Sequence, residues 1–240
     1  MISKIRLYFP GKIQSDLSSQ LTNDQTHYLK DVMRLKIGDK LSIINNLGEW
    51  NALVESYEKN EARIKIMEKV RDRDNQKNIW LAFSPIKQNS LNFVIQKGTE
   101  LGIHKFIPIL SERTIVREVN IERVKKIIVE ASEQSNRISI PEINKPVTLN
   151  FFLSTFPKDG LLVFCDISSN QNNLKNIFKK NFNGPICILI GPEGDFSESE
   201  KKTIITNNQT YSISLAKNIL KAETAAISAI TIVNYHLNLS

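Results

Sequence analysis

The chain is poor in the residues that common metal and nucleophile chemistry requires. Its 240 residues contain two cysteines and three histidines, with no spacing typical of a metal site. The nucleotide loops G-x-x-x-x-G-K-[ST] and G-x-G-x-x-G are absent, and so is the G-x-S-x-G elbow of serine hydrolases. We therefore expect no metal ion, no common nucleotide loop and no serine nucleophile.

Long apolar segments are also missing. No apolar run approaches the roughly 20 residues that span a bilayer, and the N-terminal residues lack the apolar block of a secretory signal. Cys165 and Cys187 lie within apolar, strand-like runs, which favours buried free thiols over a disulfide. These absences predict a cytoplasmic protein without a membrane partner.

The chain does have an excess of positive charge. It contains 32 lysines and arginines against 25 acidic residues, which gives a net charge of +7. Such an excess favours association with polyanions such as RNA, DNA or an anionic membrane. A lysine-rich solvated surface explains the same numbers equally well, so charge alone does not decide.

Residues 1–70 predict a small β-rich domain. Alternating apolar and polar residues indicate short strands at 41–44, 50–54 and 62–66, with a turn at 45–48. Residues 26–33 are the exception and predict a short helix. Short strands with one small helix favour a compact barrel. Residues 71–78 carry no apolar side chain and predict a linker.

From residue 79 to residue 240 strands and helices alternate, which predicts an α/β domain. Apolar runs indicate strands at 79–83, 106–110, 161–165 and 186–190. A helix is expected from a cap at Asn89 or Ser90 to an end at Gly102, and a second one at 121–136. Residues 225–233 are apolar nearly all round and predict a buried terminal helix.

Two loops near the end of the chain are the best candidates for a ligand site. Residues 191–197 (GPEGDFS) and 214–225 (SLAKNILKAETA) each follow a buried strand and precede a helix. Ligands of α/β sheets bind in loops beyond the carboxyl ends of strands. Gly191 and Gly194 let the backbone approach a ligand closely, Pro192 stiffens the turn, and Glu193 is suited to bonding a donor. By itself, such a turn is more often purely structural.

Both loops resemble the signature of the RsmE family, which methylates N3 of a uridine in 16S ribosomal RNA and belongs to the SPOUT methyltransferases. The similar segments are GPEGDFSESE at 191–200 and SLAKNILKAETAA at 214–226. Further motifs follow in the family's order: HYL at 27–29, VMRLKIGD at 32–39, QKGTELG at 96–102, SER at 111–113 and EASEQSNR at 130–137. The resemblance covers most of the chain.

The resemblance implies a fold, a cofactor and partners. Residues 1–70 are expected to form a PUA-like RNA-binding β-barrel. Residues 79–240 are expected to form a SPOUT α/β domain with a trefoil knot that binds S-adenosylmethionine. The implied protein is a homodimer that acts on 16S ribosomal RNA in the small ribosomal subunit.

The resemblance also implies roles for single residues. Cofactor contacts, largely through the backbone, are expected at Gly191, Pro192, Glu193, Gly194, Leu215, Ala216, Ile219 and Leu220. We expect Lys221 to stabilise the negative charge that develops on the uridine oxygens. The alternative is a solvent-facing lysine paired with Glu223. Glu223 itself is either a general base or an acceptor for helix-start amides.

Several residues are expected to contact RNA. By motif position these are Arg113, Arg117, Glu133, Gln134 and Arg137, which are RNA or pocket contacts. Arg137 has a second interpretation, which is to stabilise charge near the end of its helix. Arg34 and Lys36 in the barrel are expected to contact phosphates, which positions RNA without reading its sequence.

The chain departs from the family's usual residues at five positions. Asp195 and Ala216 replace glycines, Asn218 and Lys221 replace arginines, and Val124 stands where tryptophan is common. Ala216 would crowd the cofactor if its backbone needed a positive φ. Lys221 keeps the charge but loses the planar fork of arginine. Two alternatives therefore stay open: an inactive RNA-binding assembly factor of the same fold, and a methyltransferase acting on another RNA, such as transfer RNA.

Overall fold

A computed structural model describes residues 5–11, 13, 16–59, 61–73, 77–169, 184–207 and 209–238. The chain divides into two compact units. The first comprises Met1–Asn75 and Ser132–Ile140, and the second comprises Gln76–Ala131 and Pro141–Ser240. Within the described ranges, no helix has the length and apolar character needed to cross a membrane.

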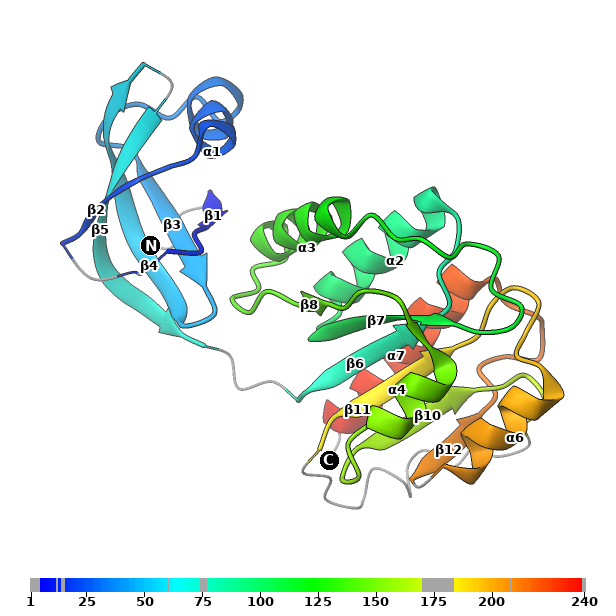
Figure 1. Ribbon diagram of the computed structural model, residues 1–240. Helices are drawn as coiled ribbons and strands as arrows, with labels where there is room; N and C mark the ends of the chain where they lie inside the picture. Colours follow the sequence, from blue (N-terminus) through cyan, green and yellow to red (C-terminus); the bar gives the residue numbers. More distant parts are fainter. Residues whose placement is uncertain are drawn as a thin grey trace. The chain divides into compact units, whose positions relative to one another are not determined.

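The first unit is built on one five-stranded sheet (Figure 1). Its strands are β1 (Arg6–Tyr8), β2 (Ser18–Gln20), β3 (Lys40–Asn45), β4 (Gly48–Glu58) and β5 (Glu61–Asp72). They lie in the order β1-β3-β4-β5-β2, with β1 parallel to β3 and all other pairs antiparallel. The strands predicted at 41–44, 50–54 and 62–66 are therefore confirmed.

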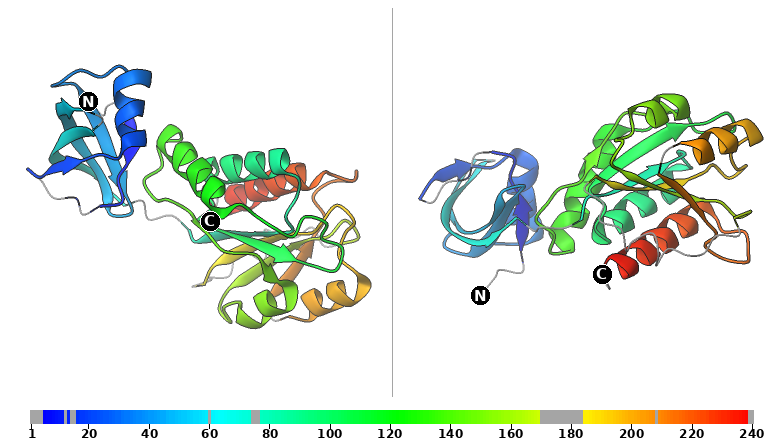
Figure 2. Two further views of the ribbon diagram at one scale, coloured as in Figure 1. Left: turned by 45° about the horizontal axis from the view of Figure 1, so that its top comes forward. Right: turned by 90° about the horizontal axis from the view of Figure 1, so that it is seen from below.

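Long bent strands curl this sheet around one apolar core (Figure 2). The β4–β5 pairing has three register shifts, and such bulges bend a strand and increase its twist. Leu41, Ile43, Ile64 and Ile66 are buried inside it, as the alternating pattern requires. The end of β5 takes in Arg71 and Asp72, the first two residues of the predicted linker, and residues 74–76 of that linker lie outside the described residues.

The predicted helix at 26–33 differs from the structure in its start and its type. Helix α1 (Asn23–His27) begins three residues earlier, because Thr22 caps it and forms a reciprocal capping box with Gln25. The chain then continues as a short π-helix (Tyr28–Val32). The T-x-x-Q pattern at 22–25 is the signal in the sequence that sets this start.

The second unit is an α/β domain. Its strands are β6 (Ile79–Phe83), β7 (Lys105–Leu110), β8 (Glu142–Ile143), β9 (Val147–Thr148), β10 (Leu161–Cys165), β11 (Ile186–Ile190) and β12 (Thr210–Ile213). Its helices are α2 (Gln88–Glu100), α3 (Ile121–Gln134, whose last turn counts with the first unit), α4 (Leu149–Thr155), α6 (Glu198–Thr206) and α7 (Ala222–Asn238). The strands predicted at 79–83, 106–110, 161–165 and 186–190 are confirmed.

The strand order of this sheet is β12-β10-β11-β6-β7-β8, with β9 also pairing with β7. All the pairs are parallel, so β10, β11 and β12 end at the same edge. Helices α2 and α7 lie side by side on one face, and α4 and α6 cover the other (Figures 1 and 2). Burial on both faces explains the uniformly apolar strands.

For helix α2 the predicted start is wrong and the predicted end is confirmed. Helix α2 starts at Gln88 after Lys87, whose side chain makes no capping bond, so neither Asn89 nor Ser90 is the cap. Gly102 does end the helix: its φ is +95°, and Ile103 N–H donates to the Gly98 carbonyl, as in a Schellman motif.

Helix α7 contains the segment 225–233 that was predicted as a buried helix. Ala226, Ala229, Ile230 and Val233 are buried at helical spacing, and only Thr231 of this segment is exposed. Tyr235, beyond the segment, is 63% exposed. The helix lies on one face of the sheet and packs against α2 and β11.

Candidate functional site

A cleft of about 350 Å³ opens at the edge of the sheet where β10, β11 and β12 end. Its lining comes from three segments, 165–167 after β10, 190–195 after β11, and 215–225 between β12 and the first turn of α7. Strand β11 pairs with one side of β10, and the next strand, β12, pairs with the other side, so the strand order reverses at β10. Ligands of α/β sheets bind at such a reversal. The volume lies in the range of small-molecule sites.

The cleft brings together both loops that the sequence singled out. All eight predicted cofactor contacts line it, namely Gly191, Pro192, Glu193, Gly194, Leu215, Ala216, Ile219 and Leu220. Residues that the sequence reasoning missed also line it, among them Cys165, Asp166, Ile167, Asp195 and Asn218. Asp166 could have been found from the sequence, since it is the first polar residue after a predicted parallel strand.

The loop after β11 is held in place by its own side chains. Phe196 is buried and packs edge-to-face on Phe164 at 5.7 Å between ring centroids. A Cβ on Gly191 would come within 3.0 Å of the Phe196 ring, so glycine permits this close approach. Asp195 has φ +60°, the left-handed conformation that glycine adopts most easily and aspartate tolerates.

A turn after β7 supports the same loop. Arg113 Nη1 donates to the Gly194 carbonyl at 2.8 Å. The turn is closed by the buried hydroxyls of Ser111 and Thr114, 2.7 Å apart. The Glu200 carboxylate links turn and loop, because it accepts from the backbone N–H of Glu112 at 2.8 Å and of Ser197 at 3.0 Å. The structure therefore places predicted Arg113 beside the cleft, with its guanidinium on the glycine loop.

The second loop leads into α7. The φ of Ala216 is not positive. The methyl group of this alanine, which stands where the family usually has glycine, therefore causes no left-handed strain. Lys221 is exposed directly before α7, and its carbonyl accepts from Ala225 N–H at 2.8 Å. A cation at the positive end of a helix is unfavourable for stability, which favours a role in function. Glu223 lies in the first turn of α7, where a carboxylate is favourable.

The cysteines do not provide a nucleophile. Both are free thiols, as the sequence predicts. Cys187 is buried, whereas Cys165 is partly exposed and lines the cleft, so the prediction of two buried thiols is correct for Cys187 only. Burial raises the pKa of both thiols, which keeps them protonated at neutral pH.

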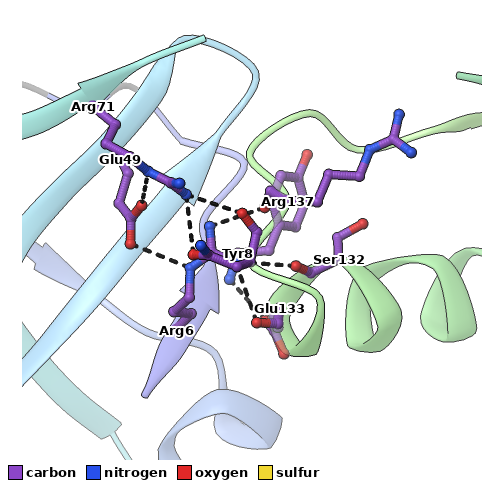
Figure 3. Close-up of polar contacts among 8 residues, drawn as sticks. Arg6, Tyr8, Glu49, Arg71, Ser132, Glu133 and Arg137 are labelled. Carbon is purple, nitrogen blue, oxygen red and sulfur yellow. Dashed lines mark hydrogen bonds and ion pairs between the residues drawn. The ribbon is translucent and has the colours of Figure 1, made fainter. Parts of the chain in front are cut away.

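The predicted contacts at the end of α3 take part in a polar network of the first unit (Figure 3). Glu133 accepts from Tyr8 N–H at 2.8 Å. Arg137 is 5% exposed, and its Nε donates to the Ser139 carbonyl at 2.7 Å. Gln134 is exposed. The positions of Glu133 and Arg137 favour a structural role over contact with RNA.

Arginines from the barrel, rather than Arg137, bond the last carbonyls of α3. Arg6 donates to the carbonyls of Ser132, Glu133 and Arg137 at 3.1, 3.3 and 2.9 Å. Arg71 donates to the Asn136 carbonyl at 3.0 Å. The other predicted RNA contacts, Arg34, Lys36 and Arg117, are exposed, and Arg34 has φ +54° in the loop after the π-helix.

The lining fits a molecule with a flat apolar part and a positively charged part. Ile190, Leu215 and Leu220 offer apolar surface, and three acidic residues, Asp166, Glu193 and Asp195, also line the cleft. S-adenosylmethionine has these properties, with an adenine ring, a sulfonium and an ammonium group. No part of the described lining contradicts such a cofactor.

Comparison with known families agrees with this chemistry. A family profile described as an RNA methyltransferase domain matches residues 73–234, and one described as an RNA methyltransferase PUA domain matches residues 21–67. The ribosomal RNA small subunit methyltransferase E of Rickettsia conorii is 35% identical over 94% of this chain and 93% of its own length.

Solved structures share the fold over nearly the whole chain. A Legionella pneumophila protein, in complex with the cofactor SAM, is 26% identical with a TM-score of 0.87, covering 98% of both chains. A ribosomal RNA small subunit methyltransferase E from Neisseria gonorrhoeae, bound to S-adenosyl methionine, is 24% identical with a TM-score of 0.85, covering 96% of this chain and 97% of its own. These neighbours confirm the expected SPOUT-type α/β domain with a PUA-like N-terminal domain, while the trefoil knot stays a prediction.

Proposed function

Because the chain belongs to the ribosomal RNA small subunit methyltransferase E family, we propose that it methylates N3 of a uridine in 16S ribosomal RNA. The methyl donor is S-adenosylmethionine, and the substrate is the small ribosomal subunit. The observation that carries this proposal is the cleft in which the two loops of the family signature meet. Its lining supports the assignment of the eight loop residues as cofactor contacts.

Methylation at N3 makes three demands on the protein. The donor must be held in line with N3, the imide proton must leave, and negative charge on O2 and O4 must be stabilised. S-adenosylmethionine supplies a methyl group activated by its sulfonium. The loops around Gly191 and Leu215 hold and orient it, and positioning of this kind lowers a barrier by up to about 7–11 kcal/mol.

Lys221 is the proposed electrostatic catalyst. It stands exposed beside Leu220 and Ala222, which line the cleft, so its ammonium is available to a uridine at the rim. A positive charge there stabilises the oxygens of the uridine as N3 loses its proton. The target uridine is presented unstacked, because N3 is buried in ordinary base pairing.

Glu223 keeps two possible roles. A carboxylate in the first turn of α7 stabilises the helix by facing its positive end. Glu223 also directly follows the cleft residue Ala222, which supports the alternative role of general base on N3.

RNA is proposed to be held by exposed cations. Arg34 and Lys36 of the first unit, and Arg117 of the second, are solvent-accessible and free to meet phosphates. Arg113 is exposed beside the cleft, which supports a contact near the reacting base.

We further propose that the protein acts in the cytoplasm as a homodimer. The family resemblance supports both statements, and the absence of a spanning helix in the described ranges is compatible with the first. Light scattering tests the dimer, for which we expect about twice the 27.4 kDa chain mass.

The function is tested by transfer of labelled methyl groups from S-adenosylmethionine to small subunits that lack the modification. Nucleoside analysis of the product should show 3-methyluridine. Fully modified subunits are the matched control and should accept no label. Bulk transfer RNA is assayed in parallel.

The outcomes separate the proposal from its two alternatives. Label in transfer RNA, with none in the subunits, would point to another RNA substrate. If calorimetry detects no binding of S-adenosylmethionine and no methyl transfer is seen, an RNA-binding assembly factor is favoured. Asn218 and Lys221, which replace the family's arginines, motivate this alternative.

A further inference from the structure

A partly buried lysine joins the carboxylates of two residues that line the cleft. Lys201 Nζ lies 2.6 Å from Asp195 Oδ2 and 3.4 Å from Asp166 Oδ1. The side chain of Lys201 is 13% exposed and that of Asp166 is 8% exposed. Lys201 belongs to α6, whereas Asp166 follows β10 and Asp195 follows β11, so one ammonium connects two of the three segments that form the cleft.

Both carboxylates are fixed by their own backbone contacts as well. Asp166 Oδ1 accepts from Ser168 N–H at 3.0 Å, and its backbone N–H donates to the Ile213 carbonyl at 2.9 Å. Asp195 Oδ1 accepts from Phe196 N–H at 2.7 Å, which leaves Oδ2 for Lys201. Each carboxylate is therefore bonded both to its own loop and to Lys201.

Asp195 and Lys201 behave as a matched pair. At φ +60°, Asp195 has a conformation that glycine adopts without strain. A carboxylate at this position adds a negative charge to the cleft edge, next to the nearly buried Asp166. Lys201 compensates that charge; without it the nearly buried Asp166 carboxylate would lose its counter-charge while the half-exposed Asp195 added a second negative charge.

The ammonium of Lys201 stays charged in this setting. Burial alone would lower its pKa, but the hydrogen bond and charge of Asp195, together with Asp166, raise it above its ordinary value. Lys201 does not itself line the cleft, so it acts on a ligand only through the two carboxylates.

We propose that Lys201 is a positioning residue for cofactor binding, which sets the spacing of the β10 and β11 loops by holding Asp166 and Asp195. This rests on the proposed function, in which the cleft binds S-adenosylmethionine. S-adenosylmethionine, the ligand proposed to bind between these two loops, carries a sulfonium and an ammonium group. Positioning by Lys201 therefore affects affinity for the cofactor more than the rate of methyl transfer once it is bound.

The test is a set of full-length variants whose dissociation constant for S-adenosylmethionine is measured by calorimetry. Lys201→Met should raise the constant about tenfold, while kcat at saturating cofactor stays within about twofold. Lys201→Arg should stay close to the wild type, because it keeps the charge. The matched control is Lys202→Met on the exposed side of the same helix, which should change neither quantity.

A double substitution tests the pairing. Asp195→Gly removes the carboxylate without left-handed strain, so Lys201→Met should cost clearly less in that background than in the wild type. If Lys201→Met does not fold, Asp195→Gly alone should still raise the constant about threefold.

The outcomes keep the two proposals apart. A wild type that does not bind S-adenosylmethionine overturns the proposed cofactor site, and this inference with it. A wild type that binds, with Lys201→Met or Asp195→Gly unchanged in affinity, overturns the role of Lys201 alone. An equal loss of affinity in Lys202→Met also overturns it.

Discussion

Single residues explain how this chain departs from its family and keeps the fold. The backbone at Asp195 adopts a left-handed φ of +60°, which accounts for the glycine usual there, while aspartate satisfies the same geometry by bonding the Phe196 N–H. Ala216 raises no such problem, since its φ is not positive. Val124 is fully buried in α3, where an apolar side chain is sufficient.

Lys221 gives the clearest prediction at this scale. Lys221→Ala should lower kcat for methyl transfer by about tenfold to a hundredfold, because the charge that stabilises the uridine oxygens is lost. Lys221→Arg should retain most activity. The measurement is single-turnover methyl transfer at saturating S-adenosylmethionine.

The control for this prediction comes from the same loop. Lys217 is exposed and does not line the cleft, so Lys217→Ala should leave kcat unchanged. If the Lys221→Ala protein has the same kcat as the wild type, Lys221 has no catalytic role and is only a solvent-facing lysine.

At the scale of elements, the end of α3 depends on charges from the barrel. Glu49 is fully buried and pairs with Arg6 at 3.2 Å and with Arg71 at 2.7 Å. Burial lowers the pKa of Arg6, and the nearby Glu49 opposes that shift. Both arginines then donate to carbonyls at and just beyond the end of α3, whose dipole favours positive charge (Figure 3).

Removal of the central carboxylate should therefore destabilise the first unit. We expect Glu49→Gln to lower the free energy of unfolding by about 3 kcal/mol, because the buried Arg6 loses its counter-charge. Hydrogen exchange of the β3–β5 amides under increasing urea measures this. Glu55→Gln, at an exposed position of the same strand, should change it by less than about 0.5 kcal/mol. Equal protection in both variants would contradict the role of the network.

At the scale of the whole molecule, the family assignment favours RNA as the partner that the net charge of +7 attracts. A positive excess steers a protein toward ribosomal RNA and makes binding depend on salt. The charge does not specify which cations meet phosphates, and burial removes Arg6 and Arg137 from that role. Exposed cations of the barrel, such as Arg34 and Lys36, remain.

Salt dependence tests this assignment. Arg34→Ala should reduce the slope of log K against log salt for RNA binding by about 0.7–0.9, the loss of one phosphate contact. Arg34→Lys should preserve the slope because it preserves the charge. Filter binding between about 50 and 200 mM salt gives both values. An unaltered slope in Arg34→Ala would exclude this residue from the RNA interface.

Local patterns predicted most of the elements correctly, and failed where several signals competed. Gly102 ends α2 as expected, since a positive φ favours glycine regardless of context. The start of α2 was wrong, because cap residues are preferences that tertiary packing overrides. The apolar segment 225–233 indicates the buried part of α7, whereas the exposed Tyr235 lies beyond that segment.

The sequence by itself determined the alternation of strands and helices and the position of the two loops, which are local properties fixed by periodicity, glycine and proline. The resemblance of these loops to a family signature then indicated eight of the residues that line the cleft. Only the tertiary structure decided that the ends of β10, β11 and β12 meet, that Asp166 joins the site, and that Lys201 holds two of its carboxylates. Strand order and long-range ion pairs bring together residues distant in the chain, and no local pattern encodes which charge will meet which.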